Sequence, residues 1–281
     1  MVSERKAILQ TLAYFDIFNY PTTFKELYRF LPFKISEKKL KESLINFEKV
    51  GKKGKYYFLK KSGKAIANRK EREFFSKKKF SIAKKICSIL SIIPTVYLIG
   101  ISGALAMNNC KENDDIDLFL ITKRKTIWST RLLVLLILQF LGKRRKKNEK
   151  NTKNKICVNL FLDEDNLYLS KRRQNLYGAH EIVQMVPLFE RKNAYNRFII
   201  ANGWIFSFLP NASPKKVFMS KKDNFFGLVI QIIEPLSMFV QKKYMREITK
   251  EEVSNNILAF HPIDYQSKVI QSHKKKLKAL I

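Results

Sequence analysis

The chain has 281 residues, enough for two or three compact units that each bury a core. Hydrophobic residues make up 46% and charged residues 28%, which excludes a disordered, charge-driven polymer. Lys and Arg number 55 against 24 Asp and Glu, so the net charge is +31 and the surface attracts nucleic acid, nucleotide phosphates or anionic lipid. Compositional drift, with its enrichment in Ile, Phe and Asn, is an equally good explanation of this charge.

The cysteines and the apolar segments exclude further classes of protein. Cys87, Cys110 and Cys157 are isolated and odd in number, which argues against a disulfide framework or a zinc knuckle. The N-terminus lacks the apolar stretch of a secretory signal. The longest apolar run, 132–141, is shorter than the ~18 to 20 residues that span a bilayer. We therefore expect a cytoplasmic protein with no integral membrane span.

Residues 1–70 predict three helices followed by a hairpin. Apolar residues recur at helical spacing over 4–18, Thr23 opens a second helix with a capping-box pattern, and Ser36 caps a third. A Gly-punctuated basic stretch then contains a strand at 56–59. This order resembles a winged helix-turn-helix domain, which implies a recognition helix, a wing and binding to DNA or RNA. Protein contact or a spacer role is the alternative.

Residues 71–176 alternate helices with short β-branched strands, the pattern of a small mixed sheet. A basic, low-complexity stretch over 142–155 predicts a loop. The predicted helices cover 70–92 and 128–141, and the predicted strands cover 96–101, 116–122 and 156–162.

Residues 177–281 predict a mostly helical region. The fold class expected for the chain is therefore α+β: a small mixed sheet flanked by helices, behind an N-terminal unit and before a helical C-terminal region. The predicted helices of that last region cover 179–189, 194–208, 225–243 with a break at Pro235, and 266–280.

The segment 99–122 carries the chemistry, because it joins a small-residue turn to an acidic strand. A strand ends at Ile101, and the next strand opens with Asp115-Ile116-Asp117. The period of two along a strand places both carboxylates on one face. Two neighbouring carboxylates repel each other, and a hard cation such as Mg²⁺ (or Mn²⁺) relieves that repulsion. Between the strands, Gly103 lets backbone N–H groups approach a phosphate.

This segment resembles the signature of the DNA polymerase beta-like nucleotidyltransferase superfamily, a Gly-Ser turn followed about a dozen residues later by Asp-x-Asp. Gly103 matches the glycine, and Asp115 and Asp117 match the acidic pair. The resemblance implies that the pair binds Mg²⁺, that the turn of Ser102, Gly103 and Ala104 holds the nucleoside triphosphate, and that a third carboxylate on a neighbouring strand activates the acceptor hydroxyl.

Two positions depart from the family pattern. Ala104 stands where the family usually has Ser, and Ser102 is the candidate replacement for that hydroxyl. On the strand predicted from 156, the polar positions are Asn159, which is a candidate metal ligand but not a general base, and Asp163, the candidate third acid at the strand end.

The expected function is transfer of an NMP from an NTP to an unidentified acceptor, in the presence of Mg²⁺ or Mn²⁺. The alternative is an inactive nucleotidyltransferase-fold regulator that binds nucleic acid through the winged helix, which the substitutions at Ala104 and Asn159 favour. A third hypothesis is a peripheral membrane protein that uses its apolar helices and basic surface. The base of the NTP, the acceptor and the oligomeric state are left open by the sequence.

Overall fold

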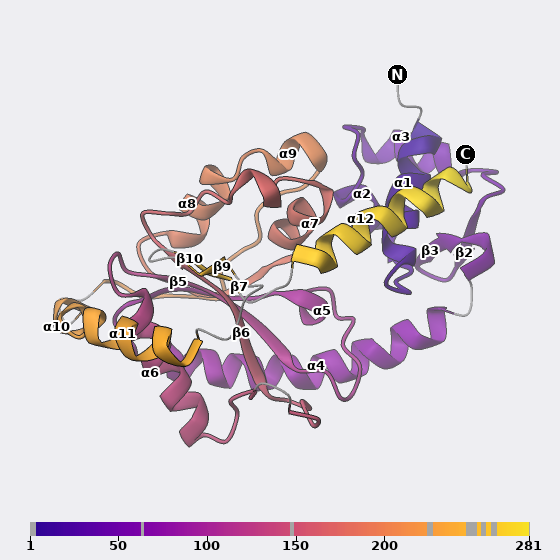
Figure 1. Cartoon of the computed structure of the whole chain (residues 1–281). Coiled ribbons are helices and arrows are strands. Elements are labelled where there is room, and N and C mark those ends of the chain that lie inside the picture. Colours follow the sequence, from indigo (N-terminus) through magenta and orange to yellow (C-terminus); the bar gives the residue numbers. More distant parts are fainter. Residues whose placement is uncertain are drawn as a thin grey trace.

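The computed structural model of the chain describes residues 4–62, 65–146, 149–223, 227–245, 252–253, 257–259 and 263–280. Within these residues the fold is mixed α/β, and its strands form one sheet of three strands and one of seven (Figure 1). Among the same residues, no helix is both long enough and apolar enough to cross a bilayer.

The N-terminal unit packs three helices against a small antiparallel sheet of order β1-β3-β2. The predicted capping box is confirmed: the Glu26 amide donates to the Thr23 hydroxyl at 3.3 Å, and the Thr23 amide donates to the Glu26 carboxylate at 2.7 Å. Ser36 caps the third helix by accepting from the Lys39 amide at 3.2 Å. The elements are α1 (Glu4–Asp16), β1 (Thr22–Thr23), α2 (Phe24–Arg29), α3 (Glu37–Leu44), β2 (Val50–Lys53), β3 (Tyr56–Leu59) and the 3-10 turn η1 (Lys60–Ser62).

The large sheet has the strand order β8-β7-β4-β5-β6-β10-β9. Strand β5 lies at its centre, antiparallel to β4 and parallel to β6. All of β4 is buried, as expected for a β-branched strand covered on both faces. The strands are β4 (Val96–Ile101), β5 (Ile116–Thr122), β6 (Ile156–Asp163), β7 (Val186–Glu190), β8 (Met219–Ser220), β9 (Glu252–Val253) and β10 (Ile257–Ala259).

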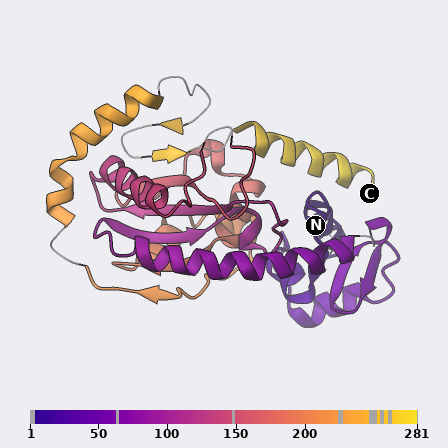
Figure 2. The same ribbon diagram turned by 90° about the horizontal axis from the view of Figure 1, so that it is seen from below.

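Helices cover both faces of this sheet (Figures 1 and 2). One core joins the sheet to α4 and α6, and a second joins it to α7 and α8 and to the aromatic residues of α1. The helices are α4 (Ala65–Leu90), α5 (Gly103–Ala106), α6 (Ile127–Phe140), α7 (Leu176–Gln184), α8 (Ala194–Ala201), α9 (Ile205–Phe208), α10 (Gly227–Ile232), α11 (Glu234–Met245) and α12 (Ile263–Lys278), with the 3-10 turn η2 (Lys171–Arg173).

Within the described residues, the region after residue 176 is mostly helical as predicted, but it also contains strands β7 to β10, and the prediction is wrong for β7, which was assigned to a helix. The helix predicted over 179–189 ends at Gln184, and β7 then pairs with β4. A short apolar run suits a helix or a buried strand equally well, and the unpaired backbone of β4 decides between them. The large sheet therefore contains strands from both sides of the boundary expected at residue 176.

A buried guanidinium joins the N-terminal unit to the rest of the chain. Arg69, on α4, is 2% exposed and lies 3.7 Å above the centre of the Tyr20 ring. It donates to the Glu26 carboxylate at 3.0 Å, to Glu73 at 2.8 Å and to the carbonyl of Pro21 at 2.7 Å. Such a charge is tolerated only when its donors are paired, so these contacts fix the position of α4 against α2.

Replacing Arg69 with Met should destabilise the protein by about 3 kcal/mol, because Glu26 and Glu73 would lose their buried partner. The measurement is urea unfolding followed by circular dichroism. The matched control is Lys70→Met, an exposed position on the same helix, which should change the free energy of unfolding by less than about 0.5 kcal/mol. Equal effects of the two substitutions would contradict the role assigned to Arg69.

Candidate functional site

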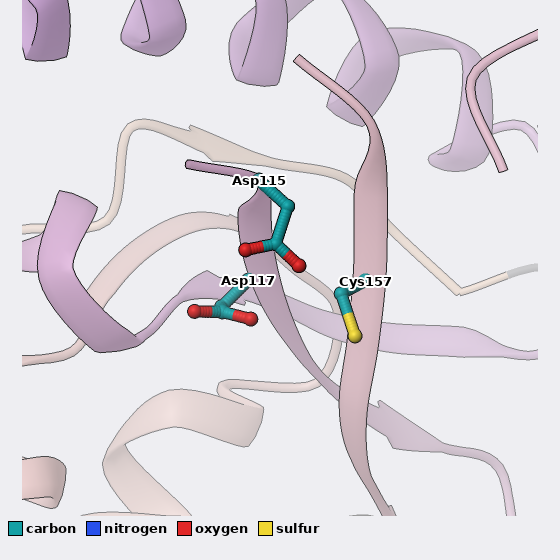
Figure 3. Close-up of side chains that lie close together, drawn as sticks. All are labelled: Asp115, Asp117 and Cys157. Atoms are coloured by element: carbon teal, nitrogen blue, oxygen red, sulfur yellow. The ribbon is translucent and has the colours of Figure 1, made fainter. Parts of the chain in front are cut away.

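The start of β5 brings two carboxylates together. Asp115 precedes the strand and Asp117 is its second residue, while Ile116 between them is fully buried in the core. Figure 3 shows both carboxylates on the same side as the thiol of Cys157, which comes from the neighbouring strand β6. One oxygen of each carboxylate and the Cys157 sulfur lie within 4.8 Å of one another. This cluster is the candidate metal centre.

The turn after β4 lies directly against Asp117. The amide of Ser102 donates to the Asp117 carbonyl at 3.0 Å, and this hydrogen bond holds the start of the turn against strand β5. Gly103 has a φ of +60°, and a Cβ at this position would lie 2.4 Å from Asp117 Oδ2. Only glycine combines that backbone conformation with so close an approach. The turn and the carboxylate therefore depend on each other.

A β-bulge in β6 places an amide beside the same carboxylate. Asp117 pairs with Cys157 and Leu118 with Val158, but Phe119 pairs with Leu160, so Asn159 is the extra residue. Asn159 is 4% exposed, and its Nδ2 donates to Asp117 Oδ1. Its Oδ1 accepts from the Cys157 thiol at 2.8 Å. In this arrangement Asn159 supports Asp117 and its oxygen is already engaged.

Burial and like charge dominate the electrostatics of the cluster. Desolvation, followed by the charge of Asp115, raises the pKa of Asp117 to about 7. Desolvation also raises the pKa of the Cys157 thiol to about 12, so this group is neutral at pH 7. A divalent cation bound between the two carboxylates would offset both the cost of desolvation and the repulsion between their charges. The oxygen donors suit Mg²⁺ or Mn²⁺, whereas a neutral thiol adds little to a site for a hard cation.

The basic loop between α6 and β6 folds back onto the acidic strand. Arg145 donates to Asp115 Oδ2 at 2.5 Å, so a guanidinium already supplies positive charge there. Lys79, on α4, is 1% exposed and donates to the carbonyls of Glu112 and Asp114 at 3.0 and 2.5 Å and to the Asn154 side chain at 3.2 Å. Lys79 thus fixes the backbone immediately before Asp115.

A pocket of about 420 Å³ opens beside the carboxylates, between the large sheet and the N-terminal unit. Aromatic rings from α1, α7 and α12 form much of its wall, and within the described residues no Lys or Arg lines it. The lining residues are Tyr14, Phe15, Phe18, Tyr20, Gly103, Ala104, Met107, Asn109, Asp114, Asp115, Asp117, Tyr177, Glu181, Gln184 and Tyr265.

Glu181, on α7, adds a fourth carboxylate to this pocket, after Asp114, Asp115 and Asp117. It also lines a smaller cavity of about 90 Å³ that contains Asn159 and Ser102. Desolvation raises the pKa of Glu181 to about 7, and its charge contributes to the raised pKa of Asp117. A carboxylate with a pKa near neutrality can take up or release a proton at pH 7. Glu181 is therefore the candidate general base that the structure supplies.

Not all of the other residues expected at the site lie beside the two carboxylates. Gly103 and Ala104 face the main pocket, whereas Ser102 lines the smaller cavity, and α5 behind them has only four residues. Asp163 lies at the opposite end of β6, paired with Thr122, where it accepts from the amides of Lys125 and Asp165 at 2.8 and 3.0 Å. The structure does not bring Asp163 together with Asp115 and Asp117.

Three residues at the site were missed by the sequence analysis: Cys157, Arg145 and Glu181. Cys157 alternates with Asn159 along the predicted strand, so strand periodicity was a signal that could have placed the two side chains on one face. No local signal marked Arg145 within a low-complexity loop or Glu181 within a predicted helix. Comparison of the chain with protein-family models, curated proteins and solved structures gives no match.

Replacing Gly103 with Ala should displace Asp117 and abolish Mn²⁺ binding, because the new Cβ overlaps the carboxylate. Binding can be measured by electron paramagnetic resonance. Gly142→Ala is the matched control: its φ is +64° and nothing lies within 4 Å of the added Cβ. Both variants should lose about 1 kcal/mol of stability from the left-handed backbone, but only the first should lose the metal. Retained binding in Gly103→Ala would contradict this geometry.

The contribution of Asp117 to the free energy of unfolding should fall as pH rises from about 4 to about 7 in metal-free buffer. Folded Asp117, with a pKa of about 7, keeps its proton over this range, whereas an unfolded Asp with a pKa of 3.8 has lost it. The folded state therefore binds more protons, and raising the pH favours unfolding. Asp117→Asn removes this contribution, so its stability relative to wild type should increase with pH. Urea unfolding at pH 5 and pH 8 tests this, and parallel pH profiles would contradict it.

Proposed function

We propose that the chain is a nucleotidyltransferase that transfers an NMP from an NTP to an acceptor in the presence of Mg²⁺ or Mn²⁺. The observation that carries the proposal is the close pair of carboxylates Asp115 and Asp117, beside the Gly103 turn at the edge of a pocket. The two carboxylates would hold the metal. When bound there, the metal would neutralise and orient the triphosphate oxygens during phosphoryl transfer.

The order of elements supports this proposal. Strand β4, the Gly103 turn, α5 and the acidic strand β5 follow one another, and β6 lies parallel to β5. These are the elements that the resemblance to the DNA polymerase beta-like superfamily implies. The N-terminal unit has the helix, helix, helix, hairpin order of a winged helix, and its exposed basic residues suit a nucleic acid backbone. They are Lys38, Lys39 and Lys41 on α3 and Lys52, Lys53 and Lys55 on the hairpin.

The residues of the pocket divide the remaining work. The rings of Tyr177 and Tyr265 offer flat surfaces for stacking a base. Glu181 would accept the proton of the attacking hydroxyl, the role that the resemblance gives to a carboxylate on a strand. Arg145 would exchange its bond to Asp115 for a triphosphate oxygen, since a guanidinium binds phosphate in the same fork geometry.

An inactive regulator that binds nucleic acid is the second candidate function, and two observations favour it. The positions on β6 beside Asp117 are held by Cys157 and Asn159 and not by an acid. Arg145 pairs with Asp115, which leaves the cluster with its own positive charge. A scaffold of this kind need not require a metal to bind a nucleotide.

Transfer of label from each of the four α-³²P NTPs to total RNA and protein tests the proposal. Wild type with Mg²⁺ or Mn²⁺ should label an acceptor, and the double variant Asp115→Ala with Asp117→Ala should not. Glu181→Gln should reduce the rate by about a hundred-fold or more if this carboxylate is the base. Asp163→Asn should keep the activity of wild type, because Asp163 lies at the other end of β6.

Two outcomes would count against the enzyme. No labelled acceptor under any condition, from a folded chain that binds nucleotide equally well in EDTA, would favour the inactive regulator. Loss of activity in Asp163→Asn with unchanged stability would instead assign the role of the third carboxylate to Asp163, at the far end of β6. The matched carboxylate control is Asp165→Asn, an exposed position two residues further along the chain.

A further inference from the structure

Helix α11 is attached to the protein by its polar face. The Glu234 carboxylate accepts from the amides of Trp128 and Ser129 at 2.9 and 2.7 Å, and so it caps the N-terminus of α6. About two turns further on, Gln241 donates to the carbonyl of Trp128 at 2.8 Å and accepts from Arg131 at 2.5 Å. Ser237 and Gln241 are only 4% and 7% exposed. The uncharged polar residues Ser237 and Gln241 of this helix thus face the protein.

The apolar residues of the same helix face outward. Leu236, Phe239 and Val240 follow the i, i+3, i+4 spacing of one helical face, so they form a single stripe. Helices α10 and α6 also expose apolar side chains, and Figures 1 and 2 show these three helices together at the end of the molecule away from both termini. We call this surface the apolar end face; its exposed residues are Leu136, Phe140, Leu141, Val229, Ile232, Ile233, Leu236, Phe239 and Val240.

The charges around the apolar end face are almost all positive. Within 127–144 and 227–243 the one carboxylate is Glu234, which is engaged in capping α6. Lys143 and Arg144 follow α6, and Lys242 and Lys243 lie in the last turns of α11. An exposed apolar stripe with a basic rim is the pattern of a helix that lies in the interface of an anionic bilayer.

A bilayer fits this surface better than a second copy of the chain. Pairing two copies through the apolar end face would bring the two basic rims together, in a chain that already carries a net charge of +31. Anionic lipid offers acyl chains for the apolar residues and headgroups for the lysines at the same time. Exposed apolar surface on this scale is seldom left open to water.

We infer that the apolar end face is a docking surface for an anionic lipid bilayer. Leu236, Phe239 and Phe140 enter the headgroup and acyl boundary, and the basic rim contacts the headgroups. The N-terminal unit lies at the other end of the molecule (Figure 1), so its basic helix and hairpin stay in solution. This inference does not depend on the proposed nucleotidyltransferase activity.

Vesicle flotation of the full chain tests the inference. The protein should float with vesicles of phosphatidylcholine containing about one third phosphatidylglycerol and not with phosphatidylcholine alone, and salt should weaken the binding. Phe140→Ser and Phe239→Ser should each weaken partitioning by about ten-fold. Phe74→Ser and Ile45→Ser are the matched controls, because these side chains are 56% and 61% exposed but lie on α4 and after α3; both should bind as wild type does.

Two results would overturn the inference. One is the absence of flotation with anionic vesicles, or flotation that Phe140→Ser and Phe239→Ser leave unchanged while circular dichroism reports intact folding. The other is a dimer in light scattering that the same two substitutions dissociate, which would assign the surface to a second copy. Phe140 is 92% exposed and lies on a different helix from Phe239, so a local folding defect caused by one substitution is not expected for the other.

Discussion

The half-buried carboxylate of Asp117 is the constraint around which the rest of the site is arranged. A carboxylate withdrawn from water beside a second one is unfavourable, and nearby groups compensate in different ways. The Gly103 turn leaves space for it, the Asn159 amide donates to it, and Arg145 offsets the charge of Asp115. The bulge in β6 exists at the residue that supplies the amide, which is where sheets commonly depart from regular pairing to aim a side chain.

The pocket depends on a second constraint, the fixed placement of the N-terminal unit. Its walls come from α1 and α12 as well as from the sheet, so a change in the position of that unit would open it. Besides Arg69, a stack of rings holds the two parts together: His180 on α7 lies 3.7 Å from Tyr14 and 5.0 Å from Phe30, measured between ring centroids. Burial keeps the pKa of His180 well below its usual range, so this ring is neutral and packs as an aromatic side chain.

Local signals in the sequence were sufficient where the structure is decided locally. The Thr23 capping box and the β-branched strands β4 and β5 follow from neighbouring residues, as does the shared face of Asp115 and Asp117. Strand β7 was missed because its assignment depends on the open edge of β4, nearly ninety residues earlier in the chain. Arg145 lies beside Asp115 because of the path that its loop takes, and Glu181 lines the same pocket because of the face that α7 turns toward it. Neither the path of the loop nor the orientation of the helix can be read from the spacing of residues in the sequence.

The last helix gives the chain an unusual order of assembly. Helix α12 returns to the N-terminal unit, where His273 bonds the carbonyl of Gln10 at 3.0 Å and Lys276 pairs with Asp16 at 2.5 Å, and its Tyr265 closes the pocket. During synthesis, α1 emerges well before α12 and meets it only after all of the intervening chain has been made. A nascent chain that lacks α12 can hold the acidic strand without the wall formed by Tyr265. The pocket is therefore complete only once α12 has been made and has packed against α1.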